Sequence, residues 1–203
     1  MKNKGTRFIA EMGIFIALGL VFDIVAKPIG DAIWPNGGSI SIAMVPIFIM
    51  SFRYGLKGGL FSGIAIGSIQ MLWSGNGIVG WAQALLDYTV AYGLVGLAGV
   101  LSKTVYKNKD NIRSVIYALI AILICGLLRT FAHILSGVLF WSQDLFDEGI
   151  ALTLIWIGSA TYNLAYMAPS IILSMIVMTV LITKYYHLVE YVDLNPKNKM
   201  SSQ

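Results

Sequence analysis

Four polar side chains interrupt three long apolar stretches of the chain, and together their types could bind a charged organic molecule. Asp87 lies in one stretch, His133 and Arg129 lie one helical turn apart in a second, and Asn163 lies in a third. At a rise of 1.5 Å per helical residue, Asp87 would lie roughly 13 Å from the start of its stretch, and the other three fall at a similar depth. Carboxylate, imidazole, guanidinium and amide groups that converge at one depth are typical of a binding cavity.

Each of these side chains also has a purely structural interpretation. Asp87 could pair with Arg129, because buried opposite charges commonly neutralise one another, and such a pair need not exclude a ligand. His133 could be a packing residue. Asn163 could form a hydrogen bond between helices. The convergence of all four favours a site over the separate interpretations.

A flat organic cation fits this set of groups best. A buried carboxylate supplies the countercharge, and each aromatic face adds a cation–π attraction of about 0.5–2 kcal/mol. Tyr88 and Trp141 are the candidate ring partners. On an ideal helix Phe140 aligns with His133 better than Trp141 does, so Trp141 reaches the site only if the helix end relaxes towards the cavity.

The composition predicts a membrane protein. The chain has 203 residues, of which 57% are hydrophobic and 12% charged, and its mean hydropathy is +0.76, whereas a soluble domain carries about 25% charged residues. A membrane-spanning helix needs roughly 20 apolar residues, so we expect an all-α integral membrane bundle of six helices, forming a single domain over residues 1–203. The helices are expected at 8–27, 39–53, 56–74, 78–103, 113–141 and 150–183, with short basic tails at 1–7 and about 185–203.

The cationic residues predict the orientation of the bundle. Most of the 14 lysines and arginines fall on one side of a six-helix chain. They are Lys2, Lys4, Arg7, Arg53, Lys57, Lys103, Lys107, Lys109, Arg113, Lys184, Lys197 and Lys199. By the positive-inside rule this side, with both termini, is cytoplasmic. The basic clusters therefore determine topology, and no nucleic acid is expected as a partner.

Two acidic residues lie near the ends of the first predicted helix. Glu11 and Asp23 are each expected to reach the membrane interface there, because a charge inside lipid is costly. The one cysteine, Cys125, excludes a disulfide and a cysteine-based metal site within the chain.

All five tryptophans are expected towards the outer side. They are Trp34, Trp73, Trp81, Trp141 and Trp156. An interfacial aromatic belt explains such positions, and for Trp73 or Trp156 alone we prefer it. A belt normally marks both interfaces, however, and the inner side has no tryptophan. Some of the indoles are therefore expected to line an outward-facing pocket.

Small residues recur every four positions in two helices. Gly55, Gly59, Gly63 and Gly67 form one continuous stripe, which favours close packing inside the bundle. The first helix carries Gly13 and Ala17 in the same spacing, and this face could dock a separate membrane protein.

Four stretches of the chain resemble one family of membrane proteins. They are Pro46–Gly59, Gln83–Tyr88, Arg129–Ser142 and Thr161–Pro169. The resemblance is to the thiamine-specific substrate-binding (S) components of energy-coupling factor (ECF) transporters, and it runs through nearly all of the chain. The second and third stretches are specific as a pair, although either alone would be a weak signal.

This resemblance implies the function and the partners. It implies high-affinity capture of thiamine from outside a bacterial cell membrane by six helices, with no cofactor, no metal and no catalytic residue. It also implies a membrane coupling protein of the EcfT type and two ATPase subunits of the EcfA type. Consistent with separate ATPases, the chain has no G-x-x-x-x-G-K-[ST] loop.

The same resemblance implies the ligand contacts. Asp87 and Tyr88 match the family's acidic–tyrosine pair, in which the acid meets the thiazolium charge; relatives often carry glutamate where Asp87 stands. His133 and Trp141 match residues that flank the ring. Asn163 matches the residue that bonds the aminopyrimidine.

Other positions match less closely. Gly13 and Ala17 match a docking motif on the first helix that often has alanine at both positions, and Trp34 supplies the aromatic residue of the first loop. Gly158 replaces a tyrosine, and Ser41 replaces an acidic residue found in some relatives. These two departures affect the expected pyrimidine contacts more than the cation contacts.

Three alternatives remain beside this hypothesis. The chain could be an S component for another vitamin. A stand-alone proton-coupled thiamine permease could use Arg129, Asp87 and His133 as a proton relay, although no inverted repeat of broken helices is evident. An intramembrane enzyme could use Asp87 and His133 as acid and base, but the sequence has neither H-E-x-x-H nor G-x-S-x-G.

Overall fold

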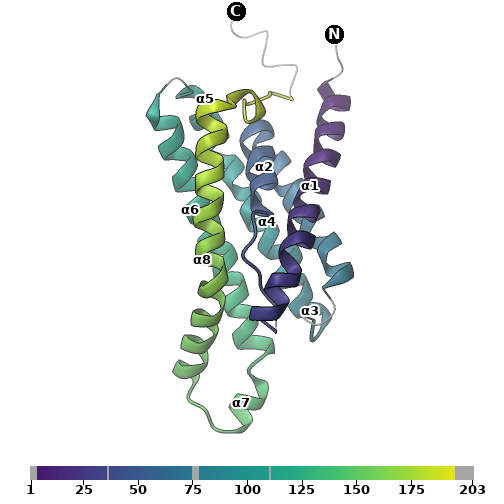
Figure 1. Cartoon of the computed structure of the whole chain (residues 1–203), viewed down its shortest axis with the longest axis vertical. Coiled ribbons are helices and arrows are strands. Elements are labelled where there is room, and N and C mark those ends of the chain that lie inside the picture. The colour runs from purple at the N-terminus through teal and green to yellow at the C-terminus, as the bar shows by residue number, and fades with distance from the viewer. Residues whose placement is uncertain (1–3, 36, 75–77, 110, 195–203) are drawn as a thin grey trace, which may run out of the picture.

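The computed structural model describes residues 4–35, 37–74, 78–109 and 111–194 as a bundle of helices without a strand (Figure 1). The long helices are α1 (Lys4–Ile33), α2 (Met44–Gln70), α6 (Ile112–Phe140) and α8 (Leu152–Lys184). One further run, Trp81–Lys107, changes its winding along its length; it comprises α3 (Trp81–Ala84), η3 (Leu85–Val90), α4 (Ala91–Val95), η4 (Gly96–Leu101) and α5 (Ser102–Lys107). The short elements are η1 (Met71–Trp73), α7 (Gln143–Asp147) and η5 (Tyr186–Leu188). The predicted all-α class is confirmed.

Within the described residues, four helices are long and apolar enough to cross a membrane on their own. They are α1, the Trp81–Lys107 run, α6 and α8. The remaining two of the six predicted passes are the arms of α2.

The two arms of α2 meet in a sharp reversal at Gly55. The φ of 67° and ψ of −159° at Gly55 lie outside the helical region, in a conformation that residues with a side chain rarely adopt. After this residue the chain returns beside itself, because a Cβ added at Gly58 would lie 2.6 Å from the carbonyl oxygen of Met50. In a continuous helix eight residues span about 12 Å. The two passes predicted on either side of Gly55 are therefore confirmed, although the first begins at Met44 rather than at residue 39.

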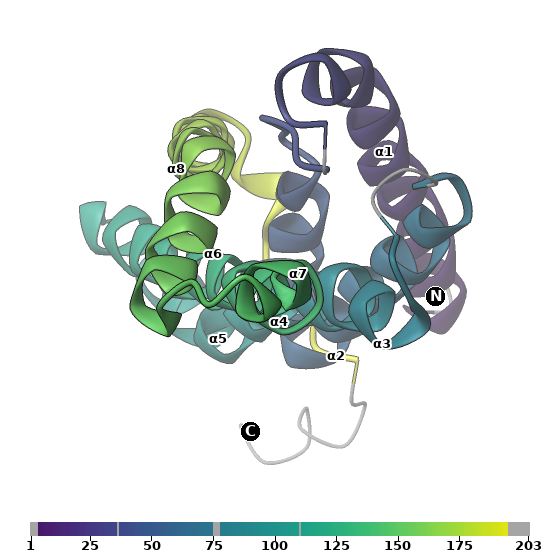
Figure 2. The same cartoon turned by 90° about the horizontal axis from the view of Figure 1, so that it is seen from below.

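The first arm of α2 forms the centre of the core. Every residue from Ala43 to Gly55 is buried. A helix that is apolar on all sides lies in a protein core or faces lipid, and the burial of this arm places it in the core. Figure 2 views the outer end of the bundle, where α1 and α8 lie on opposite sides and α2 lies between them.

The glycine stripe of the second arm packs against the Trp81–Lys107 run. A Cβ on three of its glycines would overlap backbone carbonyl groups; the pairs are Gly59 with Gly96, Gly63 with Tyr92, and Gly67 with Tyr88. The prediction of internal packing is confirmed. The stripe also determines where the backbone of η3 lies, because Gly67 is in direct contact with it.

The cytoplasmic end is closed by a polar network around Arg53, which is 4% exposed. The guanidinium donates to both carboxylate oxygens of Glu11, and its Nη1 donates to the His187 carbonyl oxygen at 2.8 Å. The Tyr54 hydroxyl donates to Glu11 at 2.7 Å. Glu11, which was expected at the membrane interface, thus joins α1 to α2, and Arg53 extends the network to the segment after α8.

The beginning of α1 and the segment after α8 lie at this same end. The Lys4 Nζ donates to the Asp193 carbonyl oxygen at 2.7 Å, and the Val192 N–H donates to the Arg53 carbonyl oxygen at 2.6 Å. This placement agrees with an even number of passes. Much of the predicted tails at 1–7 and 185–203 lies outside the described residues.

Candidate ligand-binding site

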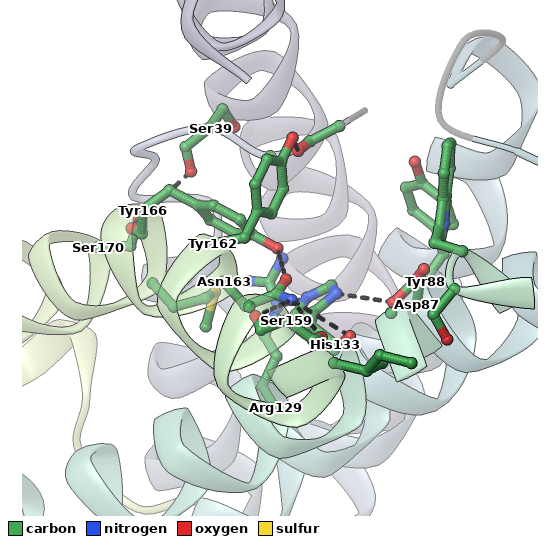
Figure 3. Close-up of a pocket in the computed structure, with 18 of the residues that line it drawn as sticks. Ser39, Asp87, Tyr88, Arg129, His133, Ser159, Tyr162, Asn163, Tyr166 and Ser170 are labelled. Atoms are coloured by element: carbon green, nitrogen blue, oxygen red, sulfur yellow. Dashed lines mark hydrogen bonds and ion pairs between the residues drawn. The ribbon is translucent and has the colours of Figure 1, made fainter. Parts of the chain in front are cut away.

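A cavity of about 400 Å³ lies in the outer half of the bundle, between α1, the first outer loop, η3, α6 and α8 (Figure 3). This volume is within the range of small-molecule sites. Five of the six side chains predicted as ligand contacts line it: Asp87, Tyr88, His133, Trp141 and Asn163. The sixth, Trp34, does not.

Asp87 is held by neutral groups. It accepts hydrogen bonds from Gln83 Nε2 at 2.6 Å and Ser136 Oγ at 2.7 Å. His133 Nδ1 lies 2.9 Å from its other oxygen (Figure 3). No ion pair joins Asp87 to Arg129 in the described part of the chain, so the structural alternative in which these two neutralise each other is not the arrangement seen here.

Arg129 sets the tautomer of His133. Its Nε donates to His133 Nε2 at 3.3 Å. A guanidinium only donates, so Nε2 must accept and the ring proton must sit on Nδ1, where it points at Asp87. The Cζ of Arg129 also lies 3.7 Å from the centroid of the Tyr92 ring, an arrangement that holds the guanidinium by cation–π attraction.

Asp87 and Tyr88 lie in a π-helical segment. The six residues of η3 form a wider turn than the α-helices on either side of it, and such turns occur frequently at functional sites. The backbone of Tyr88 packs directly on Gly67. Sequence reasoning missed this segment, because neither hydropathy nor residue spacing distinguishes a π turn from an α turn.

Asn163 links α8 to α6. Its Nδ2 donates to the Ser159 carbonyl oxygen at 2.9 Å and to the His133 carbonyl oxygen at 3.4 Å, and its Oδ1 accepts from the Tyr166 hydroxyl. Asn163 thus forms a hydrogen bond between helices, as its structural interpretation predicts, and its side chain also lines the cavity.

The first outer loop covers the α8 side of the cavity. The Tyr162 hydroxyl donates to the Gly37 carbonyl oxygen at 2.9 Å. Gly38, with φ of 121°, lies against the ring of Tyr166, where a Cβ would come within 2.6 Å. Trp34 packs edge-on against the same ring, with centroids 5.8 Å apart. Trp34 therefore supports a cavity residue and is not itself part of the wall.

The outer end of α6 relaxes towards the cavity. The helix ends at Phe140, and Trp141 follows it as the C-cap, donating its N–H to the Gly137 carbonyl oxygen at 3.2 Å. Trp141 lines the cavity, as the hypothesis of a relaxed helix end requires.

The two departures from the family pattern, Gly158 and Ser41, both line the cavity. A Cβ on Gly158 would have no neighbour within 4 Å, so this part of the wall has open space. The Ser41 N–H donates to Ser170 Oγ at 3.1 Å and holds the loop on α8.

The position of Asp23 differs from the sequence prediction. It was expected at the membrane interface, but it lines the cavity from α1. Gly19, one turn before it, packs against Ile66 and Ala43, and this contact turns the Asp23 face of α1 inward. The position of Asp23 near a helix end gave no signal of this.

Gly13 and Ala17, the predicted docking residues, are exposed on the opposite part of α1. A Cβ on Gly13 would meet nothing within 4 Å, so this small face takes no part in packing within the described structure. Among the described residues, no group of three or more His, Cys, Asp or Glu side chains could hold a metal ion.

A multi-pass helical bundle whose cavity presents a carboxylate among aromatic rings defines an integral membrane protein that binds a small molecule. Comparison with known proteins makes this more specific. Residues 9–190 match the family model described as "Thiamine transporter protein (Thia_YuaJ)", and the chain belongs to this family. It is therefore a multi-pass membrane protein of a transporter family, and no relative found is named as an enzyme.

Individual relatives agree with this assignment. The chain is 37% identical over 174 residues to "Thiamine transporter ThiT" of Bacillus subtilis, covering 84% of this chain and 88% of that protein. It is 27% identical over 189 residues to the protein of the same name from Lacticaseibacillus paracasei, covering 90% of each. The solved structure of ThiT from Listeria monocytogenes superposes with a TM-score of 0.76 at 27% identity, covering 94% of this chain and 100% of that one.

Proposed function

We propose that this chain captures thiamine from the outer side of a bacterial cell membrane and delivers it to an energising complex. The complex consists of a membrane coupling protein of the EcfT type and two EcfA-type ATPase subunits, and the capture subunit uses no cofactor. The names of the relatives support thiamine as the ligand.

One observation carries the choice of a cationic ligand: among the described residues, the Asp87 carboxylate accepts hydrogen bonds only from neutral partners. A buried carboxylate without a protein countercharge is costly, and a thiazolium ring supplies the missing positive charge. Trp141, Tyr88 and the His133 imidazole offer flat faces around that position.

Titration of intrinsic tryptophan fluorescence with thiamine tests the binding function. Purified protein in detergent should show saturable quenching, because Trp141 lines the cavity and would contact or shield the guest. A Trp141→Phe variant should lose most of the signal change, while Trp81→Phe, which removes an indole that is 81% exposed, should retain it. If thiamine caused no fluorescence quenching and calorimetry showed no heat of binding, the proposal would be wrong.

Uptake into liposomes tests the partners. Thiamine uptake should require the coupling protein and both ATPases together with ATP. Robust uptake by this chain alone under a proton gradient would instead support the permease, for which the hydrogen-bonded line of Arg129, His133 and Asp87 would be the relay.

A substitution on the small face of α1 tests docking. Gly13→Leu adds bulk where the described chain has no neighbour within 4 Å, so thiamine binding should persist while uptake with the complex is lost. The matched control is Val25→Leu, on the same helix at a side chain that is 69% exposed, and it should retain both activities. Uptake that survives in Gly13→Leu would contradict docking at this face.

A further inference from the structure

The cavity wall carries more charge than one ligand contact requires. Two carboxylates, Asp23 and Asp87, face the cavity together with the Arg129 guanidinium and the His133 imidazole. His133 is the neutral tautomer, because its Nε2 accepts from Arg129 and its Nδ1 points at Asp87. With both carboxylates ionised, two negative groups and one positive group give the wall one net negative charge.

Asp23 acts on Arg129 across the cavity. Asp23 and Arg129 both line the cavity, and their opposite charges act on one another and on Tyr92, whose ring lies under the guanidinium. No ion pair of 4 Å or less joins Asp23 to Arg129 within the described residues. The two charges therefore interact electrostatically without being in contact. The nearby Lys27 and Asp31 pair with each other at 3.1 Å and largely cancel.

We propose that Asp23 determines the charge selectivity of the cavity: its carboxylate offsets the Arg129 guanidinium, so that Asp87 remains the one uncompensated charge and the site selects a singly positive guest. This inference rests on the proposed function. Arg129 is needed to orient His133, but its positive charge alone would repel a cationic ligand. The negative charge of Asp23 offsets this repulsion.

The consequence is discrimination against phosphate esters of the same ligand. A phosphate monoester carries about −1.5 to −2 charges at neutral pH, which more than cancels the single positive charge of thiamine. The wall with its net negative charge opposes such a molecule. Without Asp23 the wall becomes neutral, and the Arg129 guanidinium is free to attract the phosphoryl group.

The test compares thiamine with thiamine monophosphate by calorimetry on Asp23→Asn, with Asp23→Ser as a second neutral variant should the first fail to fold. The Kd for thiamine should rise about tenfold, since loss of a unit charge from the wall of a site with an effective dielectric of about 20 has an effect of this order. The Kd for the monophosphate should stay unchanged or fall, so the preference for thiamine should narrow by at least about tenfold.

Two variants serve as controls. Asp23→Glu keeps the charge and should keep the preference of the wild type. The double variant Lys27→Gln/Asp31→Asn removes a carboxylate of the same helix, whose side chain is 47% exposed, together with its ion-pair partner outside the cavity wall, and it should also leave the preference unchanged.

Three results would overturn the inference. An unchanged ratio of the two Kd values in both neutral variants would do so, and so would an equal loss of both ligands, because equal loss indicates a direct contact instead of a charge effect. A narrowed preference in Asp23→Glu would do the same. Failure of the wild type to bind thiamine at all would instead defeat the proposed function.

Discussion

Two of the carboxylates in the helices of the bundle, Glu11 and Asp87, are compensated by the protein in opposite ways. Glu11, at the cytoplasmic end, accepts from two arginines and a tyrosine; these are Arg7, Arg53 and Tyr54. Asp87, in the outer half, accepts only from neutral groups in the part of the chain that the structure describes; these are Gln83, His133 and Ser136. The arginines of the chain neutralise the charge of Glu11. The hydrogen bonds to Asp87 hold its carboxylate in place, but no positive group of the described residues contacts it.

This difference separates a structural polar network from a binding site. A paired carboxylate joins segments and contributes to stability only as long as all partners stay in place. A carboxylate bonded by neutral donors is held in position while its charge remains available. The carboxylate of Asp87 can therefore accept a cationic ligand, whereas the carboxylate of Glu11 is already paired with arginines of the chain.

The largest effect is expected when the uncompensated charge is removed. Asp87→Asn should weaken thiamine binding by roughly 100- to 1,000-fold, because a contact between unit charges at about 4 Å is worth up to about 4 kcal/mol at an effective dielectric of 20. Fluorescence titration or calorimetry measures this. Glu11→Gln, the matched change at the other carboxylate, should leave the Kd within about twofold; equal losses in the two variants would remove the distinction between them.

The compensated network should respond in stability instead of affinity. Arg53→Met leaves the carbonyl oxygens of His187 and Glu190 without this donor and Glu11 with only the exposed Arg7 as a cation, which should lower the free energy of unfolding by about 2–4 kcal/mol. Thermal unfolding of the purified protein in detergent measures the change. The Kd of the folded variant should match that of the wild type, and a large loss of affinity would show that the two ends are coupled.

A smaller effect on both quantities is expected at the glycine stripe. Gly67→Ala places a Cβ on the Tyr88 carbonyl group, so η3 must shift, at a cost of about 1–3 kcal/mol in stability and with a loss of affinity through Asp87. Gly13→Ala is the control, because its Cβ meets nothing within 4 Å, and it should unfold at or above the wild-type temperature. Normal binding by Gly67→Ala would show that η3 tolerates displacement.

The smallest effect is expected at the loop over the cavity. Tyr162→Phe removes the hydrogen bond to Gly37, worth about 0.5–1.5 kcal/mol, and should weaken binding by about two- to tenfold. Because the loop lies over the ligand, stopped-flow kinetics should place the change in the dissociation rate. A change confined to the association rate would contradict a covering role.

The passes and their order were predictable because hydropathy reports how many apolar residues a segment has. The reversal at Gly55 was expected between two passes, since Arg53 and Lys57 on either side belong to the cytoplasmic interface. The start of the first arm was less predictable, because residues 39–43 have the hydropathy of a helix end but form loop hydrogen bonds to Ser170 of α8.

The members of the site were predictable where the depth of a residue along its helix was enough to place it at the cavity. Asp87, His133 and Asn163 fall at one level, and the structure brings them to one cavity. The inward direction of Asp23 depends on which face of α1 packs against α2, and the tautomer of His133 depends on a contact with Arg129. Neither property is encoded in the spacing of residues within a single helix.

The open space beside Gly158 has a practical consequence for spectroscopy. The chain has one cysteine, Cys125, and it is buried in α6. A thiol introduced by Gly158→Cys would meet no neighbour within 4 Å and would face the cavity. An environment-sensitive dye attached there, in a Cys125→Ala background, would report occupancy of the cavity in real time without relying on the native indoles.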